Sequence, residues 1–388
     1  MAGYSQLELP GFPSVRQGVL PSQQIEKLIR EGEVYATKKI DRKQIQPASL
    51  DLRLGCQAYR LQASFLPGSR SRFESKLSDL AMEFDLSQLT VLEKGRVYLV
   101  KLMEGLRLPK DLEARANPKS TTGRLDVFTR LITESGAEFE RVEREYSGPL
   151  YAEIMPRTFS VIVHPGLSLS QIRFIRGNAE LSADELEELD REETLIYIDE
   201  ETSNAARIRD GGVALSVNLR GNGDEVVAYR GKKNAPLVDL RGAYDPDRFW
   251  DPISNCPDGR LILNPGDFYI LASRERVRVP RQCAAEMVPF DPSVGEFRIH
   301  YAGFFDPGFG YGNGSITGTR AVLEVRAHET PFVIEHEQVV GRLIYSWVRG
   351  TPEKVYGKSI GSSYQRQELA LSKQFRPPTV VAAGQIED

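Results

Sequence analysis

The chain has 388 residues, of which 40% are hydrophobic and 27% are charged, and its formal net charge is −4. This composition fits a soluble globular protein with room for two domains, and it excludes the broad basic footprint of a nucleic-acid-binding protein. The three cysteines are widely spaced and odd in number, which excludes a disulfide framework and favours a reducing cytoplasm. No apolar run reaches the length of a membrane helix and no signal-peptide pattern is visible, so we expect neither a membrane segment nor export.

The chain carries no arrangement of residues that is typical of a zinc site. It has no CxxC or HExxH motif, and no His-x-Glu motif is paired with Pro-Cys-x-x-Cys. None of its four histidines lies at ligand spacing from a cysteine. Zinc-dependent nucleobase deaminases require a set of histidine and cysteine ligands, so the sequence excludes that class of enzyme and predicts no catalytic metal.

In chain order, the first predicted element is an arm over residues 1–21, where glycine and proline recur. A short helix follows: Ser22 begins it, three apolar residues share one face, and Gly32 ends it. From Ile45 onward, short strand-like runs alternate with glycine, proline and polar turns, which predicts a mainly β fold. The clearest of these runs are 97–103, 150–155, 160–163 and 172–175.

Residues 117–125, Asn-Pro-Lys-Ser-Thr-Thr-Gly-Arg-Leu, lie between two strand-like runs and are unusually polar. They place two cations, three hydroxyls and a glycine within positions 119–124. Hydroxyls and backbone N–H groups donate hydrogen bonds, lysine is a point charge and arginine can grip two oxygens, so this run suits an anion. The alternative is a solvated basic turn, because serine, threonine and glycine are ordinary turn residues.

Further along, Ser182 and Glu185 form a capping-box signature, which predicts an acidic helix that ends near Glu193. Its many charged side chains are expected to form a solvated face. The helix and the loop after it, over residues 180–208, are the expected boundary between two halves of the chain.

The two halves are copies of one unit. Four residues recur 171 positions later: Gly95, Tyr98, Pro109 and Glu153 return as Gly266, Tyr269, Pro280 and Glu324. Residues 49–53, Ser-Leu-Asp-Leu-Arg, return as Ser-Val-Asn-Leu-Arg at 216–220, an offset of 167. A constant offset with small drift indicates a duplicated β unit with loop insertions. We therefore predict an N-terminal domain over residues 1–200 and a C-terminal domain over residues 201–388.

The copies differ where the chemistry is concentrated. In the second copy, residues 288–295 correspond to the polar run and have lost its lysine, its serine–threonine pair and its arginine. The second copy instead carries Asp-Pro-Gly at 306–308, and Asp51 of the first copy is replaced by Asn218. Either each copy supplies what the other lacks, or one copy serves only as a scaffold, and the residues alone leave both readings open.

Four blocks of the chain resemble the deoxycytidine triphosphate (dCTP) deaminases, which share the trimeric dUTPase-like fold. The first is the helix at 24–31 with Ile-Gln-Pro-Ala-Ser-Leu-Asp-Leu-Arg-Leu-Gly at 45–55, and the second is Lys-Ser-Thr-Thr-Gly-Arg-Leu at 119–125. The third is Asp-Pro-Gly at 306–308 with Ala-Val-Leu-Glu-Val at 321–325, and the fourth is the tail at 356–367. The chain is similar to a double-length bacterial form of these enzymes. The resemblance implies a mainly β fold of two tandem dUTPase-like (β-clip) units, each a distorted β-barrel or jelly roll, with a few short helices.

The sequence departs from the family pattern at three places. Lys119 stands where the family has an arginine, Ser363 aligns with a lysine of the family's tail, and residues 309–320 are an insertion. The departure in the tail leaves the mode of phosphate binding open. The insertion could reshape the pocket for the base.

The resemblance implies a reaction: hydrolytic removal of the amine at C4 of cytosine in dCTP, which yields dUTP and ammonia without a metal in the chemical step. It thereby implies a cytoplasmic hydrolase of a cyclic-amidine C–N bond in deoxynucleotide biosynthesis, with no nucleic-acid or membrane partner. A homo-oligomer, dimer or trimer, is expected, and Mg²⁺ is expected to accompany the triphosphate. Whether dTTP inhibits the enzyme stays open.

The resemblance also assigns roles to individual residues. Glu324 would take a proton from water and give it to the departing nitrogen, and Glu153 holds the same place in the first copy. Strand alternation puts Glu324 and Arg326 on one face, so both are expected at a pocket. Ser120 and Arg124 would position the water, stabilise charge at the ring or hold phosphate. The candidate substrate-binding residues are Lys119 and Thr121 for the triphosphate, Asp306 for the 3′-hydroxyl, Tyr356 and Gln367 in the lid-like tail, and Gln171.

These residues are divided between the copies, which predicts a composite pocket formed within one chain or between two. Ser120 and Arg124 belong to the first copy, and Asp306, Glu324 and the tail belong to the second. Two other functions compete with a deaminase: a dUTPase, alone or combined with deamination, and a non-catalytic nucleotide sensor. Pyrophosphate release would indicate the first, and ammonia release from dCTP separates an enzyme from a sensor.

Overall fold

The computed structural model describes residues 17–68, 73–220, 225–254, 256, 258–289, 297–299, 303–327, 329–357, 364 and 367–376. Several features of the sequence lie outside these residues: the predicted arm up to residue 16, positions 290–295 of the second copy, His300, His328 and Ser363.

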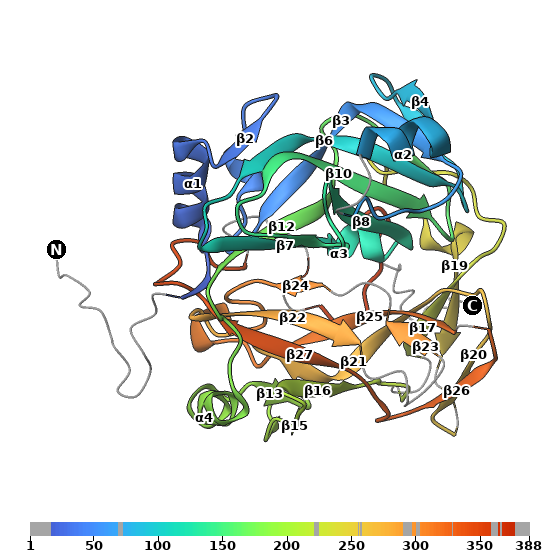
Figure 1. The fold of residues 1–388 in the computed structure, drawn as a ribbon. Coiled ribbons are helices and arrows are strands. Elements are labelled where there is room, and N and C mark those ends of the chain that lie inside the picture. The colour runs from blue at the N-terminus through green and yellow to red at the C-terminus, as the bar shows by residue number, and fades with distance from the viewer. Residues whose placement is uncertain are drawn as a thin grey trace, which may run out of the picture.

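The first copy is a β lobe with short helices at its rim, drawn from blue to green in Figure 1. Its helices are α1 (Ser22–Glu31), α2 (Phe73–Leu80) and α3 (Ser120–Gly123). Its strands are β1 (Gly18–Val19), β2 (Val34–Ala36), β3 (Leu50–Leu61), β4 (Ala81–Asp85), β5 (Thr90–Leu92), β6 (Val97–Arg107), β7 (Leu112–Pro118), β8 (Val127–Thr133), β9 (Arg141–Val142), β10 (Ser147–Pro156), β11 (Val161–Val163) and β12 (Ser168–Arg176).

The second copy is a β lobe that lies against the first (Figure 1). It begins with the acidic helix α4 (Ala183–Glu193), whose predicted capping box is confirmed because Ser182 accepts from the N–H of Glu185 at 3.3 Å. Its strands are β13 (Ile196–Tyr197), β14 (Ser203–Asn204), β15 (Ile208–Arg209), β16 (Gly212–Ser216), β17 (Val226–Gly231), β18 (Val238–Asp239), β19 (Trp250–Ser254), β20 (Arg260–Leu263), β21 (Tyr269–Val277), β22 (Cys283–Pro289), β23 (Phe297–Ile299), β24 (Phe304–Phe305), β25 (Thr319–Ala327), β26 (Phe332–Glu335) and β27 (Val339–Trp347).

The sheets of the two lobes follow related plans. In the first lobe the strand order is β8-β10-β6-β3-β12-β7-β9, with β1, β2 and β4 paired at its sides. The second lobe has β14-β13-β21-β17-β19, with β25 beside β21, and a separate sheet β15-β16-β27-β22-β24. The described chain is therefore mainly β, as predicted. None of its described helices is long and apolar enough to span a membrane.

Equivalent residues of the repeat have equivalent conformations. Gly95 and Gly266 lie just before β6 and β21, and each has a φ of 75°, a left-handed conformation that favours glycine. Three residues later, the hydroxyls of Tyr98 and Tyr269 each accept a hydrogen bond from the backbone N–H five residues before them, at 3.0 and 3.1 Å. The duplication that the sequence predicts is thus a duplication of local structure.

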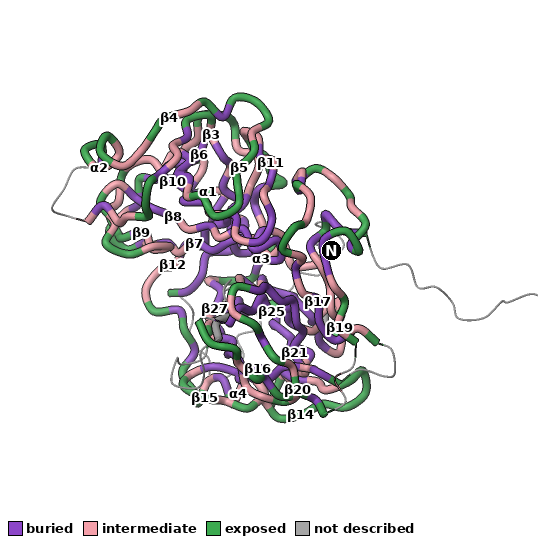
Figure 2. Tube along the Cα trace, turned by 90° about the vertical axis from the view of Figure 1, so that its right-hand side faces the viewer, coloured by how far each residue is buried: buried purple, intermediate pink, exposed green. Residues whose placement is uncertain are grey.

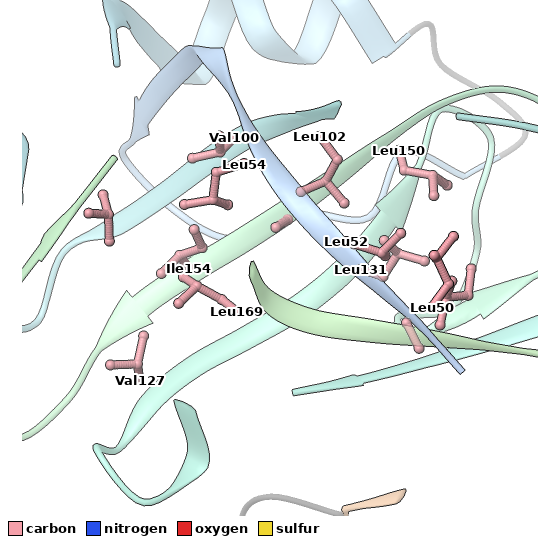
Figure 3. Packing of buried hydrophobic residues seen from close by; sticks show 14 of the residues in the cluster. Leu50, Leu52, Leu54, Val100, Leu102, Val127, Leu131, Leu150, Ile154 and Leu169 are labelled. Atoms are coloured by element: carbon pink, nitrogen blue, oxygen red, sulfur yellow. The ribbon is translucent and has the colours of Figure 1, made fainter. Parts of the chain in front are cut away.

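Each lobe has an apolar core made by strand alternation. In the first, alternate residues of β3, namely Leu50, Leu52 and Leu54, point inward and pack with β6 and β10 residues such as Leu102 and Ile154 (Figure 3). The second core is centred on β16, β21, β25 and β27. Burial of this apolar surface is the main stabilising contribution to such lobes.

The two lobes are joined by backbone pairing, apolar packing and a buried ion pair. Strand β18 of the second copy pairs in parallel with β11 of the first, and Trp250 and Phe375 belong to the first lobe's core. At the boundary, the guanidinium of Arg326 donates to the fully buried carboxylate of Asp126. Figure 2 shows buried residues continuing between the lobes, with α3 at this boundary. The polar run therefore faces the second copy.

Candidate functional site

The polar run forms the short helix α3 between β7 and β8. The N–H of Lys119 donates to the carbonyl of Leu169 at 2.9 Å, and the N–H of Arg124 donates to the carbonyl of Ser120 at 3.0 Å. Residues four apart lie on one face of a helical turn, so Ser120 and Arg124 point the same way. Both line a cavity at the boundary between the lobes.

That cavity has a volume of about 60 Å³ and is walled by both copies and by the tail. Six of the predicted site residues line it, three from the first copy and three from the second. They are Lys119, Ser120, Arg124, Glu324, Tyr356 and Gln367. The other lining residues are Pro118, Met287, Gly303, Phe304, Phe305, Phe309, Val322 and Tyr364. A composite pocket within a single chain is therefore what the structure contains.

Glu324 is the only carboxylate among the described residues of the cavity wall. It lies on β25, is 4% exposed, and its Oε1 is 3.9 Å from Nε of Arg124. Burial raises the pKa of Glu324 to about 8, although the Arg124 charge acts in the opposite direction. A carboxyl group that titrates close to neutral pH can both accept and donate a proton.

Arg124 is held in place by two contacts. Its Nη1 donates to the carbonyl of Ala370 at 3.1 Å, and its guanidinium stacks on the ring of Tyr364 at 3.8 Å from the centroid. Its Nε is buried and has no hydrogen-bond partner among the described residues. A buried donor without a partner is costly, so Arg124 retains a donor that a ligand or water can use.

The tail lies across the cavity. The N–H of Tyr356 donates to Pro307 at 2.7 Å, and Tyr356 in turn accepts from the N–H of Tyr364 at 3.2 Å. Gln367 donates to the carbonyl of Arg320 at 3.0 Å. The next residue, Glu368, binds the guanidinium groups of both Arg276 and Arg320. The described residues of the tail thus line the cavity and are fastened beside it.

Asp306 lies behind the cavity wall rather than in it. It is 8% exposed, and its Oδ1 is 3.5 Å from Nη2 of Arg173. Burial raises the pKa of Asp306 to about 6, with Arg173 opposing and Asp51 reinforcing the shift. Phe305, next to it, lines the cavity.

Two further predicted substrate-binding residues, besides Asp306, lie outside this cavity. Gln171 is buried on β12, where its side-chain oxygen accepts from the hydroxyl of Ser49 at 3.2 Å. Thr121 lines a neighbouring cavity, and its carbonyl accepts from the hydroxyl of Ser372 at 2.8 Å. Lys119 lines both cavities and forms an ion pair with Asp51.

Glu153 is not brought together with the other candidates. It lies on β10 of the first copy, and its Oε1 accepts from Nη2 and Nε of Arg130 at 2.5 and 3.1 Å. No part of the cavity wall includes it. Arg326, expected at the pocket beside Glu324, instead binds Asp126 because its side chain turns toward the first copy.

Sequence reasoning missed several residues of the site. Tyr364 lies within the tail block, next to Ser363, where the family has a lysine. Its position in this block could have identified it as a site residue. Phe309 begins the insertion that was expected to reshape the base pocket, and Val322 lies two residues before Glu324 on the same strand. Arg173 and Asp126 carry no sequence signal, since their partners come from the other copy.

Comparison with known proteins shows a family match for each half of the chain. Residues 16–178 match the 2′-deoxycytidine 5′-triphosphate deaminase (DCD) N-terminal domain, and residues 182–375 match the C-terminal domain of the same family. The crystal structure of 2′-deoxycytidine 5′-triphosphate deaminase from Agrobacterium tumefaciens is 49% identical with a TM-score of 0.81, covering 86% of this chain and 100% of that one.

Curated relatives match a shorter part of the chain. The dUMP-forming dCTP deaminase of Halobacterium salinarum is 28% identical over 186 residues, which is 44% of this chain and 91% of that protein. The dCTP deaminase of Haloarcula marismortui is 30% identical over 134 residues, which is 34% of this chain and 66% of that protein. These relatives are therefore close to one copy in length.

Proposed function

Since the chain belongs to the 2′-deoxycytidine 5′-triphosphate deaminase family, we propose that it hydrolyses the 4-amino group of the cytosine in dCTP and releases dUTP and ammonia. The observation that carries this proposal is the position of Glu324, buried beside Arg124 in a cavity that both copies and the tail enclose. Ser120 lines the same cavity.

Glu324 is proposed as the group that moves protons. As carboxylate, it takes a proton from a water molecule whose oxygen forms the new bond to C4. As carboxylic acid, it then gives that proton to the amine, so that the C4–N bond breaks and ammonia leaves. Burial of Glu324 supports both steps because it brings the pKa of the carboxyl group close to the pH at which the enzyme works.

Arg124 and Ser120 are proposed as fixed donors. The unpartnered Nε of Arg124 and the hydroxyl of Ser120 can donate to the attacking water or to charge that develops on the ring. Tyr364 and the tail hold these donors in place before the reaction begins. The donors therefore need not reorient when charge develops on the ring, and fixed donors stabilise such charge most effectively.

Opening of the tail is part of this proposal. A cavity of about 60 Å³ has room for a few water molecules and not for a nucleotide. Tyr356, Tyr364 and Gln367 must therefore move for dCTP to enter, and their return would exclude water from the reacting base.

Mg²⁺ is proposed to arrive with the triphosphate. One carboxylate oxygen of Asp51, Oδ2, is already paired with Lys119. Phosphate oxygens and water would then hold the ion, which is a common arrangement for Mg²⁺. The residues of this chain would meet the phosphates through Lys119 and the hydroxyls of α3.

The test is release of ammonia from dCTP by the purified full chain, compared with Glu324→Gln and Arg124→Ala. Each variant should lose deamination, and mixing the two after co-refolding should not restore it, because both walls belong to one chain. Near-wild-type activity of either single variant would reject the composite pocket. Absence of ammonia release by the wild-type chain would favour a nucleotide sensor.

A second candidate is a deaminase that also hydrolyses the product to dUMP. It is favoured by the similarity to the Halobacterium salinarum relative, which is a dUMP-forming dCTP deaminase. Pyrophosphate release measured alongside ammonia release decides between them, since a dUTP-forming enzyme yields ammonia alone.

A further inference from the structure

Two ion pairs cross the boundary between the lobes at neighbouring positions of the same two segments. In the first pair, Nε of Arg124 lies 3.9 Å from Oε1 of Glu324. Two residues further along each segment, Asp126 binds Arg326. The first copy thus supplies the cation of one pair and the anion of the other. All four residues are at most 6% exposed, so solvent screens both pairs only weakly.

The pair of Asp126 and Arg326 is held by several hydrogen bonds. Nε of Arg326 donates to the two carboxylate oxygens of Asp126 at 3.3 and 3.1 Å, and Nη2 donates to Oδ2 as well. Nη1 donates to the carbonyl of Gly266 at 2.7 Å, and Nη2 also donates to the hydroxyl of Thr158 at 2.8 Å. That hydroxyl donates in turn to Asp126 at 2.6 Å. A pairing of this two-pronged kind fixes orientation as well as distance.

Short stretches of chain connect this pair to Arg124 and Glu324. The N–H of Asp126 donates to the carbonyl of Gly123, the last residue of α3, at 2.8 Å, so Asp126 and Arg124 belong to one hydrogen-bonded turn. Asp126 has a φ of 55°, a left-handed conformation that aspartate adopts more readily than most residues. Glu324 and Arg326 are two residues apart on β25, and alternate residues of a strand share a face. A displacement of one pair would therefore displace the other.

The first copy lacks the equivalent of Arg326. Met155, on β10, lies 171 positions before Arg326 and carries no charge. Glu153, two residues earlier, pairs with Arg130 of its own copy and does not line the cavity. The buried arginine therefore accompanies the glutamate that faces the cavity and is missing beside the other one. Since apolar residues of similar volume often stabilise a fold as well as a buried ion pair does, this distribution favours a role in positioning.

We propose that Asp126 and Arg326 are positioning residues of the reaction, and that their ion pair fixes α3 against β25 and so sets the distance between Arg124 and Glu324. The proposal rests on dCTP deamination being the function of the cavity. Neither Asp126 nor Arg326 lines that cavity, so neither contacts the reacting base there. Their contribution should appear in kcat, which depends on the placement of Arg124 and Glu324, and hardly in KM.

The test is Arg326→Lys and Arg326→Met in the full chain, assayed by ammonia release from dCTP. Lysine keeps the charge and loses the two-pronged contact, so kcat should fall about tenfold, with KM changed less than about twofold. Methionine removes the contact altogether and should lower kcat about a hundredfold. Thr158→Val removes one hydroxyl from the pair and should lower kcat about threefold, which tests the proposal even if Arg326→Met does not fold.

Arg130→Met is the matched control, because it breaks the other buried pair, that of Glu153. It should lower stability by an amount comparable to Arg326→Met and leave kcat per folded molecule unchanged. An equal fall of kcat in the two methionine variants would overturn the proposal, since it would reflect general damage. Unchanged kcat in both Arg326 variants would overturn it as well.

A double-variant comparison tests whether Arg326 acts through Arg124. Arg326→Lys should cost about tenfold in kcat in the wild-type background and less than about twofold beside Arg124→Lys, because the placement of the guanidinium no longer matters there. Equal costs in the two backgrounds would overturn the proposal.

A measurement without turnover separates this proposal from the proposed function. In a crystal structure of Arg326→Lys, the distance between Nε of Arg124 and Oε1 of Glu324 should exceed 3.9 Å. The increase should be about 0.5 Å or more, the tolerance within which such groups must be held. An unchanged distance would overturn the positioning role even if activity fell. A longer distance in a chain whose wild type releases no ammonia would retain the positioning of the two side chains and reject the deaminase.

Discussion

Glu324 and Glu153 occupy the same position in the two copies and have different surroundings. Both are buried on a strand of the same sheet pattern, at 4% and 1% exposure. Glu324 faces a cavity and is 3.9 Å from Arg124 of the other copy, while Glu153 is bonded at 2.5 Å to Arg130 of its own copy. A duplicated backbone therefore repeats a position without repeating its chemistry, because the partner across the lobe boundary decides what the carboxylate can do.

The first copy also closes the space in front of its own strand. Tyr151 stands 171 positions before Val322, which lines the cavity of the second copy. The ring of Phe73, at the start of α2, lies 4.5 Å from the ring of Tyr151, and both belong to a small apolar cluster. In the second copy, the stretch 171 positions after α2 includes Phe249 and Trp250, which belong to the first lobe's core. One copy thus uses this stretch to fill its own face, and the other uses it to dock.

The largest expected effect separates the two glutamates directly. Glu324→Gln should lower kcat for dCTP deamination about a thousandfold, since it removes a group that both accepts and donates a proton. Glu153→Gln should leave kcat within about twofold, because Glu153 does not line the cavity that contains Glu324. Steady-state ammonia release measures kcat for both variants. A comparable loss of kcat in Glu153→Gln would show that the first copy contains a second active site.

Removal of Arg130 tests whether the buried ion pair of Glu153 contributes to stability and not to catalysis. Arg130→Ala leaves the carboxylate of Glu153 buried without its partner, so the free energy of unfolding should fall by about 2–3 kcal/mol. Deamination per folded molecule should not change. Urea denaturation with activity assays measures both, and the double variant Arg130→Ala with Glu153→Gln should recover part of the lost stability. A loss of activity without a loss of stability would contradict this prediction.

The pKa of Glu324 predicts how rate and stability depend on pH. Because its raised pKa is about 8, kcat/KM should fall about tenfold for each pH unit below 8. The folded chain retains a proton that the unfolded chain releases above about 4.5, so this residue lowers stability as pH rises from there to 8. Glu324→Gln should therefore melt at a higher temperature than wild type at pH 8 and at the same temperature near pH 4. Equal melting temperatures at both pH values would contradict the assignment.

The smallest expected effect concerns the fastening of the tail. Glu368→Gln weakens the contacts to Arg276 and Arg320, and KM for dCTP should rise about two- to fourfold, because Glu368 is half exposed and such pairs contribute little. The difference should shrink in about 0.5 M salt, which screens the wild-type pair. Glu335→Gln, which breaks an exposed pair with Arg260 away from the site, is the control and should show no change. A rise in KM that salt does not reduce would argue against an electrostatic fastening.

Much of this architecture is predictable from the sequence. Strand alternation, capping residues and the 171-residue offset predict the elements and the duplication, because these depend on local pattern. Ser120 and Arg124 belong to the first copy, and Glu324 belongs to the second. Because each copy lacks residues that the other has, this division predicts a cavity shared by both copies. The roles assigned to these residues remain predictions until activity is measured.

What could not be predicted depends on contacts between distant segments. The 171-residue offset assigns Glu153 and Glu324 equivalent positions. It gives no information about their different neighbours, such as α2 and Arg130 in the first copy. Strand alternation places Arg326 beside Glu324 on one face, but Asp126 draws the arginine toward the other copy. Lys373 lies in a tail segment whose path is set by hydrogen bonds to Thr121 and Leu240, and no local pattern specifies that path.

The enclosure of one cavity by both halves of one polypeptide has a kinetic consequence. In an enzyme whose site lies between separate subunits, dilution separates the catalytic groups and the specific activity falls. Here Arg124 and Glu324 are tethered in the same molecule, so their encounter is a unimolecular event at a fixed effective concentration. Specific activity should stay constant as the protein is diluted through the nanomolar range. Because duplication and fusion placed both halves of the site in one chain, each molecule would have a complete site at any enzyme concentration in the cell.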